Sequence, residues 1–366
     1  MSDWDKRLKG LMGEPSTDAG DDANRLARVE RTRGEMMEQG AAIAETLAAE
    51  RDALMRIAAR LHGRVARTVI AGCGDSWFAG VAARLAWERL TGTPAEPVQA
   101  FDWAHYGSAT ADHRTLVIGL SSGGNTPAVM TALRAARARG AATVGISNTA
   151  GSPIVTEFDG LIVHATRRGW PTQSSTAAVA LLIALAGRIA GSAQLDAGLA
   201  ALPAIADGVA REFDERARAA AERLAATRLV LFAGGGPHFA AACFGAAKIK
   251  ELSPIHAIAM PIEEYHHYRS QKRGDPLFLV APDAASRERA LDTALVSRAV
   301  GGNTIALLSS ADDDIAARVD EAWVLPPVAP ELAPIICSIP LHLFAYHFAK
   351  ARFARRLGYP PAFEAS

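Results

Sequence analysis

The chain has 366 residues, of which 49% are hydrophobic and 21% are charged, a profile typical of a globular protein with room for two domains. Lys plus Arg equals Asp plus Glu at 39 each, so no excess charge points to nucleic acid or an anionic membrane as a partner. The polar start lacks the apolar core of a signal peptide, and no run of about 18 uncharged apolar residues predicts a membrane span. The three cysteines have neither disulfide nor zinc spacing, so we expect buried free thiols and a cytoplasmic location.

Apolar segments that end in Gly, Ser or Pro alternate with helical patterns along the chain. Residues 2–24 are predicted to be disordered or loosely attached, and residues 25–61 predict a helical extension of one or two helices. Helices are also predicted at 77–90 and 126–140. Near-continuous apolar strands that alternate with helices predict parallel sheets covered on both faces. The predicted strands lie at 67–74, 115–124, 142–148, 159–165, 228–236, 275–282, 298–310 and 320–326.

The second half of the chain repeats the strand–loop order of the first half at an offset of about 161 residues. A constant offset over four strand–loop units predicts two copies of one α/β domain. The boundary is predicted in the Ala- and Gly-rich stretch at 194–207. We therefore predict a tail and helical extension at 1–62, a first domain at 63–200 and a second domain at 201–366.

Three loops in the first half place small and hydroxyl residues at the start of a helix: 72–76 (GCGDS), 120–126 (LSSGGNT) and 172–176 (TQSST). Glycine lets backbone N–H groups approach a ligand, the hydroxyls donate hydrogen bonds, and the helix N-terminus adds a positive dipole end. Ligands of open parallel sheets bind at the carboxyl ends of the strands. The loops therefore predict a site for a tetrahedral oxyanion, although hydroxyl residues before a helix also serve as plain N-caps.

Motifs for the common cofactors are missing from the sequence. Neither GxxxxGK[ST] nor a GxGxxG after the first strand is present, so neither ATP nor NAD is implied. The His, Cys and Asp residues have no metal-ligand spacing. We expect neither a cofactor nor a metal.

The order strand–GCGDS–helix and strand–LSSGGNT–helix, followed by KIKELSPIH at 248–256 and EEYHH at 263–267, resembles the double SIS (sugar isomerase) domain of glucosamine-6-phosphate synthases. The letters GNTP at 124–127 are also similar to fructosamine-6-phosphate deglycases. The resemblance covers residues 68–349 and implies an α/β fold of two tandem SIS domains, each a three-layer α/β/α sandwich. The glutaminase domain of the synthases has no counterpart in the sequence.

The resemblance implies a set of site residues. Glu251 would move the proton between C1 and C2 of the sugar, and Lys248 would lie close to it. His267 would open the sugar ring, and in the synthases this histidine comes from the neighbouring subunit, so we expect a homodimer with shared active sites. The residues that would bind the anionic sugar are Ser76, Ser121, Ser122, Thr126, Ser174, Ser175, Gly74 and Asp75.

Elementary chemistry agrees with a carboxylate as the group that transfers the proton. It leaves alternative roles open for Glu251 and for the histidines. Desolvation raises the pKa of a buried carboxylate toward neutrality, which suits a base that shuttles a proton. Glu251 lies in an apolar helical run, where an acid is costly without a task or a partner, and an ion pair with Lys248 is the alternative. His266 is a chemical candidate equal to His267, which could also be a surface histidine. His256 is interpreted as structural.

The sequence departs from the synthase pattern at the anion site. Asp75 stands where the synthase loop has Thr, and Gly123 stands where it has Ser. An acid at Asp75 would repel a dianion unless it points away or binds a hydroxyl or an amine. The C-terminal catalytic lysine of the synthases has no equivalent. Basic residues expected to supply positive charge are Arg167, Arg168, Arg269, Lys272 and Arg273.

Four functions remain compatible with these residues. The first is an aldose–ketose isomerase that acts on a 6-phosphorylated or otherwise anionic sugar by metal-free proton transfer. The second is a fructosamine-phosphate deglycase or an amino-sugar-phosphate deaminase. The third is an isomerase of a sulfonated sugar, because a sulfonate is also tetrahedral but carries one charge fewer. The fourth is a non-catalytic sugar-phosphate sensor, which the presence of Glu251 and the lack of a flanking helix-turn-helix disfavour.

Overall fold

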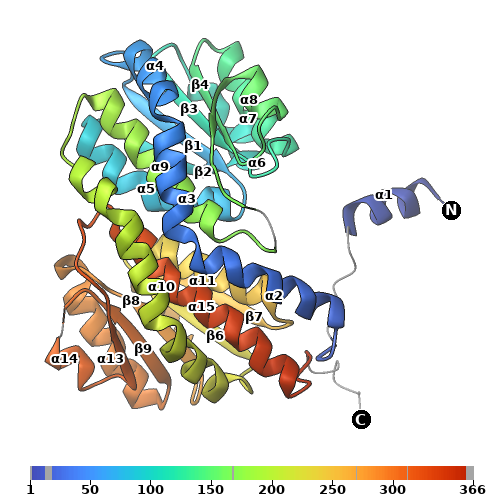
Figure 1. Ribbon diagram of the computed structural model, residues 1–366, viewed down its shortest axis with the longest axis vertical. Helices are drawn as coiled ribbons and strands as arrows, with labels where there is room; N and C mark the ends of the chain where they lie inside the picture. The colour runs from blue at the N-terminus through green and yellow to red at the C-terminus, as the bar shows by residue number, and fades with distance from the viewer. Residues whose placement is uncertain (1, 13–18, 167–168, 269, 311, 360–366) are drawn as a thin grey trace.

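The computed structural model describes residues 2–12, 19–166, 169–268, 270–310 and 312–359. Two five-stranded parallel sheets, one in each half of the chain, dominate the described residues (Figure 1). The strands are β1 (Arg67–Gly72), β2 (Ala95–Gln99), β3 (Thr115–Leu120), β4 (Ala142–Ser147), β5 (Asp159–Ile162), β6 (Leu229–Gly234), β7 (His256–Pro261), β8 (Pro276–Val280), β9 (Asn303–Leu308) and β10 (Glu321–Val324). Their order is β2-β1-β3-β4-β5 in the first sheet and β10-β9-β8-β6-β7 in the second.

Helices cover both faces of each sheet, which confirms the predicted pair of three-layer α/β domains. The repeat is also visible in the strands, since β1, β3, β4 and β5 correspond to β6, β8, β9 and β10. The helices are α1 (Asp3–Met12), α2 (Ala23–Met37), α3 (Gln39–Ala49), α4 (Arg51–Leu61), α5 (Asp75–Thr91), α6 (Ala100–Asp102), α7 (Pro127–Ala138), α8 (Pro153–Glu157), α9 (Gln173–Ala190), α10 (Asp196–Leu224), α11 (His238–Leu252), α12 (Ile262–Tyr268), α13 (Arg287–Val300), α14 (Asp313–Ala316) and α15 (Ala333–Ala354).

The register of the first sheet brings its loops together at one edge. Strand β3 is buried at every position, as expected for a central strand of a parallel sheet. It pairs with β1 on one side, with Ala71 opposite Gly119, and with β4 on the other, with Leu120 opposite Ile146. The loops after β1, β3 and β4 therefore leave the sheet side by side.

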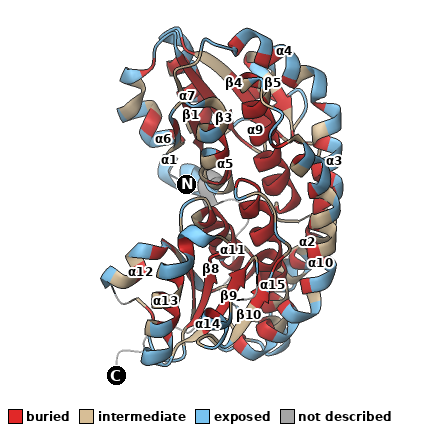
Figure 2. Ribbon diagram, turned by 90° about the vertical axis from the view of Figure 1, so that its left-hand side faces the viewer, coloured by how far each residue is buried: buried red, intermediate tan, exposed pale blue. Residues whose placement is uncertain are grey.

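The two domains share one hydrophobic core. Helices α5 and α9 of the first domain and α11 and α15 of the second face each other, and the long helix α10 packs along α15. Figure 2 shows this buried layer running continuously through the middle of the molecule. By composition α9 is long and apolar enough to span a membrane, but 89% of that stretch is buried inside the fold, as in the core helix of a globular domain.

The N-terminal segment is more ordered than the sequence predicted. Residues 3–12 form helix α1, which stands apart from both domains in Figure 1. Of the two predicted states, disorder is therefore wrong for residues 3–12, whereas loose attachment agrees with the position of α1. Residues 13–18 lie outside the described part of the chain. The helical extension consists of three helices, α2, α3 and α4, rather than one or two. Single residues, Glu38 and Glu50, separate them, so the breaks leave no loop signal in the sequence.

Two edge strands were missed by the sequence reasoning. Strand β2 contains Pro97, which an edge position tolerates because one side of the strand needs no hydrogen-bond donors. Strand β7 begins at His256, whose exposed ring lies 5.2 Å from the ring of Tyr359. The stretch 194–207, where the domain boundary was predicted, belongs almost entirely to α10, so a continuous helix joins the two sheets. All three cysteines are free; Cys73 is only half-buried.

Candidate functional site

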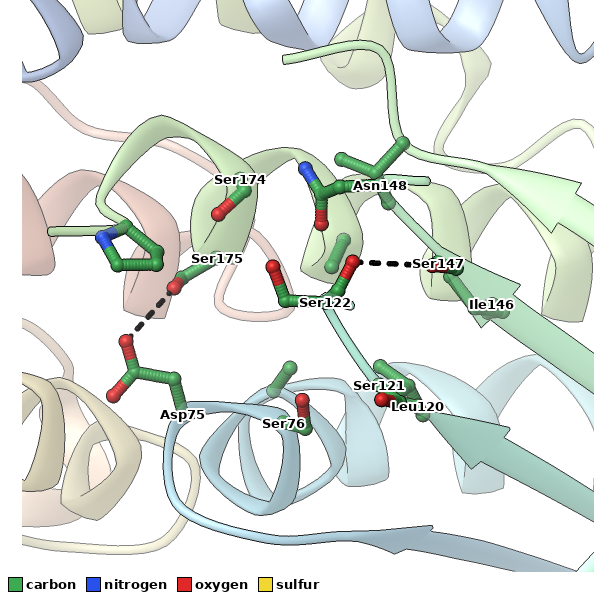
Figure 3. A pocket seen from close by; sticks show the side chains of 14 residues that line it. Asp75, Ser76, Leu120, Ser121, Ser122, Ile146, Ser147, Asn148, Ser174 and Ser175 are labelled. Carbon is green, nitrogen blue, oxygen red and sulfur yellow. Dashed lines mark hydrogen bonds between the residues drawn. The ribbon is translucent and has the colours of Figure 1, made fainter. Parts of the chain in front are cut away.

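A pocket of about 410 Å³ opens at the carboxyl ends of β1, β3 and β4 of the first sheet (Figure 3). This is the edge at which the three hydroxyl-rich loops were predicted to meet. Helix α9 closes the far side of the pocket with its first turns. The lining residues are Asp75, Ser76, Ala79, Leu120, Ser121, Ser122, Ile146, Ser147, Asn148, Val163, Pro171, Ser174, Ser175 and Ala178.

The loop after β3 is held together by Ser121. Its Oγ accepts hydrogen bonds from the backbone N–H groups of Gly124 (3.1 Å) and Thr126 (3.3 Å) and lies 2.8 Å from Thr126 Oγ1. Gly124 has φ +71°, and a Cβ there would lie 1.9 Å from Ser152 Oγ, so this turn needs glycine. Because Ser121 is only 3% exposed, its hydroxyl shapes the loop and is already occupied within it.

Two other polar groups of the pocket have no partner among the described residues. Ser122 Oγ and Asn148 Nδ2 are both buried atoms without a hydrogen bond. Figure 3 shows the side chains of Ser122, Asn148 and Ser174 around the same space. Buried donors left unpaired are costly, so this space suits a ligand that carries acceptor oxygens. Asn148 follows β4 directly, and its place at the carboxyl end of a predicted strand was a signal that the sequence reasoning did not use.

Asp75 begins helix α5, directly after Gly74, which has φ +54° and is exposed. Asp75 Oδ2 accepts hydrogen bonds from Ser175 Oγ (3.1 Å) and from Lys248 Nζ (2.6 Å). The acid therefore binds a hydroxyl and an ammonium group, which is the arrangement that relieves repulsion of an anionic ligand. Ser175 is thereby turned toward Asp75, whereas Ser76 and Ser174 line the pocket without such a bond.

The second domain contributes Lys248 and Glu251 from helix α11, which packs against α5. Lys248 Nζ donates to Asp75 Oδ2 and to Glu251 Oε2, each at 2.6 Å. The side chain of Lys248 is fully buried, while those of Asp75 and Glu251 are 20% and 33% exposed. The ion pair between Glu251 and Lys248, which was the predicted alternative, is present. Lys248 also pairs with Asp75, which lines the pocket, so the ion pair is connected to the pocket.

The ionisation of Lys248 and Glu251 depends on their burial and on the charges around them. Burial raises the pKa of Glu251, the charge of Lys248 opposes this shift, and the charge of Asp75 adds to it. For Lys248, burial alone would lower the pKa, but the charges of Asp75 and Glu251 outweigh burial and raise it. Lys248 is therefore charged at neutral pH, and Glu251 holds its proton to a higher pH than an ordinary glutamate. A carboxylate with a raised pKa binds a proton more readily than an ordinary glutamate, which suits a group that takes up a proton and returns it.

The histidines lie elsewhere. His267 is on the short helix α12 with a 62% exposed side chain, 3.8 Å from Glu263 Oε1, and it is not among the residues that line the pocket of its own chain. His266 Nε2 lies 3.0 Å from Thr293 Oγ1, and burial lowers its pKa. Two of the expected basic residues do not line the pocket either. Lys272 and Arg273 are exposed in the turn before β8, and Arg167, Arg168 and Arg269 lie outside the described residues.

The corresponding edge of the second sheet carries different chemistry. At the repeat offset, His238 takes the place of Ser76 and Asp283 that of Ser122. His238 Nε2 lies 2.8 Å from Asp283 Oδ2, and this hydrogen bond lowers the pKa of Asp283 to about 2. Pro282 and Cys337 line a cavity of about 310 Å³ there, mostly with aliphatic and proline side chains. A carboxylate in such a cavity disfavours an anion, so this edge differs in charge and in polarity from the hydroxyl-lined pocket of the first domain.

Comparison with known proteins places this geometry in context. The model of the SIS domain family matches residues 64–188 and 224–352. Glutamine–fructose-6-phosphate aminotransferase (isomerizing) of Thermus thermophilus is 31% identical over 300 residues, covering 78% of this chain and 49% of the relative. The same enzyme of Corynebacterium diphtheriae is 29% identical over 345 residues, covering 87% and 55%. The chain thus spans about half the length of the curated relatives it matches.

Solved structures share the fold at lower sequence identity. The C-terminal domain of glucosamine-fructose-6-phosphate aminotransferase from Francisella tularensis superposes with a TM-score of 0.74 and 22% identity, covering 92% of this chain and 98% of that one. Tagatose-6-phosphate ketose/aldose isomerase from Escherichia coli gives a TM-score of 0.66 at 18% identity, covering 88% and 92%. Glucosamine-6-phosphate deaminase from Thermotoga maritima gives 0.64 at 19%, covering 88% and 98%.

Proposed function

Because the chain belongs to the SIS domain family, we propose that it is an enzyme that interconverts the aldose and ketose forms of a small sugar with an anionic end. The anion, most simply a 6-phosphate, binds between the loop after β3 and the start of α9. The sugar carbons then extend toward Asp75 and Glu251. The observation that carries the proposal is Glu251, a carboxylate whose pKa is raised by burial, beside a pocket whose donors lack partners.

The proposed chemistry needs one base and no change of oxidation state in the enzyme. Glu251 removes the proton from the carbon next to the carbonyl of the open-chain sugar, which gives an enediolate. The hydroxyl proton of the sugar passes to the former carbonyl oxygen, and Glu251 returns its own proton to the neighbouring carbon, so that the carbonyl moves between C1 and C2. Lys248, charged at neutral pH and 2.6 Å from Glu251 Oε2, holds this carboxylate in place and stabilises it after it has released the proton.

A substrate panel tests this function directly. The full chain is incubated in D₂O with sugar 6-phosphates, 6-sulfonates and the matching neutral sugars, and the products are followed by NMR. Turnover of a charged sugar with uptake of deuterium at C1 or C2 supports an isomerase, and the preferred anion distinguishes phosphate from sulfonate. Binding of a sugar phosphate without any turnover would instead favour the sensor.

A second candidate, cleavage of a C–N bond, is favoured by Asp75. This residue adds a carboxylate to the site 2.6 Å from the same ammonium that binds Glu251, and an additional acid suits a substrate that carries an amine. The proton transfer is the same, but it converts a ketosamine into an imine, which water hydrolyses to an aldose and a free amine. Release of an amino acid or ammonia from fructosamine 6-phosphates or glucosamine 6-phosphate distinguishes this activity from isomerisation.

Ser122→Ala is expected to weaken binding of the anionic sugar about tenfold, because it removes a hydroxyl that has no other partner among the described residues, and hydrogen bonds to charged groups contribute about 1.5–3 kcal/mol. Isothermal titration with the charged sugar and its neutral analogue measures the effect. Ser121→Ala is the matched comparison: its hydroxyl accepts two backbone N–H groups, so this variant should also lose stability. Equal losses for charged and neutral ligands in Ser122→Ala would remove this hydroxyl from the anion site.

We further propose a homodimer in which His267 serves the partner's site, since its side chain is exposed and lies outside the pocket of its own chain. Glu251→Gln and His267→Ala chains, each inactive alone, should then regain about a quarter of wild-type activity when they are mixed and re-associated, because half of the dimers contain one intact site. Sedimentation measures the assembly. If the monomer is active, the site is not shared between subunits. If a dimer forms but the mixed chains show no activity, His267 takes no part in the reaction at the partner's site.

A further inference from the structure

The turn at the end of β4, residues 147–149, surrounds one carbonyl group of the loop after β3. Ser147 Oγ donates a hydrogen bond to the carbonyl oxygen of Ser122 at 3.1 Å, which Figure 3 marks, and Thr149 Oγ1 donates to it at 3.2 Å. The backbone N–H of Asn148, between them in sequence, donates to the same oxygen at 3.2 Å. A carbonyl oxygen has two lone pairs, so these three donors saturate it.

The turn is also tied to itself and, further along, to the same loop. Ser147 Oγ accepts a hydrogen bond from the backbone N–H of Thr149 at 3.0 Å. At the start of α8, the backbone N–H of Ile154 donates to the carbonyl oxygen of Gly124 at 3.0 Å. The segment from β4 to α8 is therefore attached to the loop after β3 at two carbonyl groups, those of Ser122 and Gly124.

These bonds determine where two polar groups of the pocket lie. Ser122 Oγ and Asn148 Nδ2 are buried atoms without a hydrogen bond among the described residues. Because a peptide group is planar, fixing the Ser122 carbonyl restricts the direction in which the Ser122 side chain leaves the backbone. Asn148 is the middle residue of the turn, so the same contacts place its side chain. Thr149 does not line the pocket, so it affects a ligand through these neighbours and not by contact.

We propose that Thr149 is a positioning residue of the anion site, whose hydroxyl holds the polar groups of Ser122 and Asn148 in the arrangement that binds the anionic end of the sugar. The inference rests on the proposed function, because that function supplies the anion. Donors that are held in place before the ligand arrives bind it without the cost of ordering them. Thr149 therefore contributes to affinity for the anion and not to proton transfer, since Glu251 belongs to α11 of the other domain.

Thr149→Val tests the inference in the full chain, because valine keeps the shape of the side chain and lacks the hydroxyl. The Kd for fructose 6-phosphate, measured by isothermal titration, should rise about three- to tenfold, the effect of one hydrogen bond. KM should rise with it while kcat stays near that of the wild type, and binding of fructose should not change. Thr149→Ser should restore the wild-type Kd. Thr156→Val is the matched control, because Thr156 Oγ1 donates to the Ser152 carbonyl and not to Ser122.

A carbonyl signal shows whether the effect passes through Ser122. Ser122–Gly123 is the only Ser–Gly pair in the sequence, so a chain labelled with ¹³C at serine carbonyls and ¹⁵N in glycine gives a single correlation between the two. The chemical shift of a carbonyl carbon responds to the hydrogen bonds that its oxygen accepts. The signal should therefore move in Thr149→Val, return toward the wild-type position in Thr149→Ser and stay in place in Thr156→Val.

The outcomes separate this inference from the proposed function. If the wild-type chain neither binds nor turns over fructose 6-phosphate, that substrate fails, and inorganic phosphate becomes the probe for the same variants. Weaker binding of phosphate to Thr149→Val, without any turnover, supports the inference alone. If Thr149→Val does not fold, the smaller Thr149→Ala gives the same comparison. A folded variant that lacks the hydroxyl but keeps the wild-type affinity for the anion, or an unmoved carbonyl signal, overturns the inference, as does a wild-type chain that binds no phosphate.

Discussion

Replacing Glu251 by Gln is expected to reduce turnover by about 10²–10⁴-fold, the largest effect on activity among the variants considered. The amide keeps the size of the side chain and can still contact Lys248, but it cannot accept the proton from the sugar. In the wild type, activity should fall as the pH drops through the raised pKa of Glu251, because the base must be ionised to begin the reaction. Steady-state rates between about pH 5 and 9 measure both effects.

The stability of Glu251→Gln is measured as a control, to show that a loss of activity does not come from unfolding. Since the folded-state pKa of Glu251 lies above its ordinary value, ionising Glu251 costs stability as the pH rises through that pKa. A glutamine does not titrate, so this dependence on pH should be absent from Glu251→Gln, and the chain should stay folded because Lys248 keeps its ion pair with Asp75. A folded variant with near-wild-type turnover would remove Glu251 from the chemistry.

Lys248→Met is expected to lower both stability and activity. The side chain of Lys248 is fully buried between two carboxylates, and removing one partner from a buried ion pair costs about 3 kcal/mol or more. Because the folded-state pKa of Lys248 is raised, its stabilisation is complete at neutral pH and is lost only as the pH rises through that value. Without the ammonium, Asp75 and Glu251 repel each other, and Glu251 binds its proton more tightly.

Urea unfolding at several pH values tests this expectation. The loss of stability in Lys248→Met should be largest where both carboxylates are ionised and should shrink as the pH falls through the raised pKa of Glu251, because its protonation removes the repulsion. Lys250→Met is the matched control, because Lys250 is exposed two residues further along the same helix. A Lys248→Met chain as stable as the wild type at neutral pH would show that the ammonium does not hold the two domains together.

Local patterns were sufficient for most of the fold. Continuous apolar strands and the repeat offset predicted both sheets, because a central parallel strand is buried on both faces and needs no alternation. The same reasoning located the loops of Ser76, Ser121 and Ser122, since parallel strands end at one edge. Strand β2 escaped it because an edge strand that contains Pro97 has neither a long apolar run nor alternation.

Contacts between distant residues could not be predicted from local patterns. Asp75 and Lys248 are 173 positions apart in sequence, and only the packing of α5 against α11 brings them together. Ser121 lines the pocket as expected, but the hydrogen bonds that its hydroxyl accepts from the backbone of its own loop depend on backbone dihedral angles and could not be predicted.

The ion pair of Asp75 with Lys248 is one of two, among the described residues, that join the two copies of the domain. At the position in the first copy that corresponds to Glu251 stands Arg89, which donates to the buried Glu331 of the second copy at 2.8 Å. The first copy contains the hydroxyl-lined pocket, whereas the second contains Glu251 and, at its corresponding edge, Asp283 in a mostly aliphatic cavity. A chain cut between the two copies would therefore separate the hydroxyl-lined pocket from Glu251, and it would part Asp75 from Lys248 and Arg89 from Glu331.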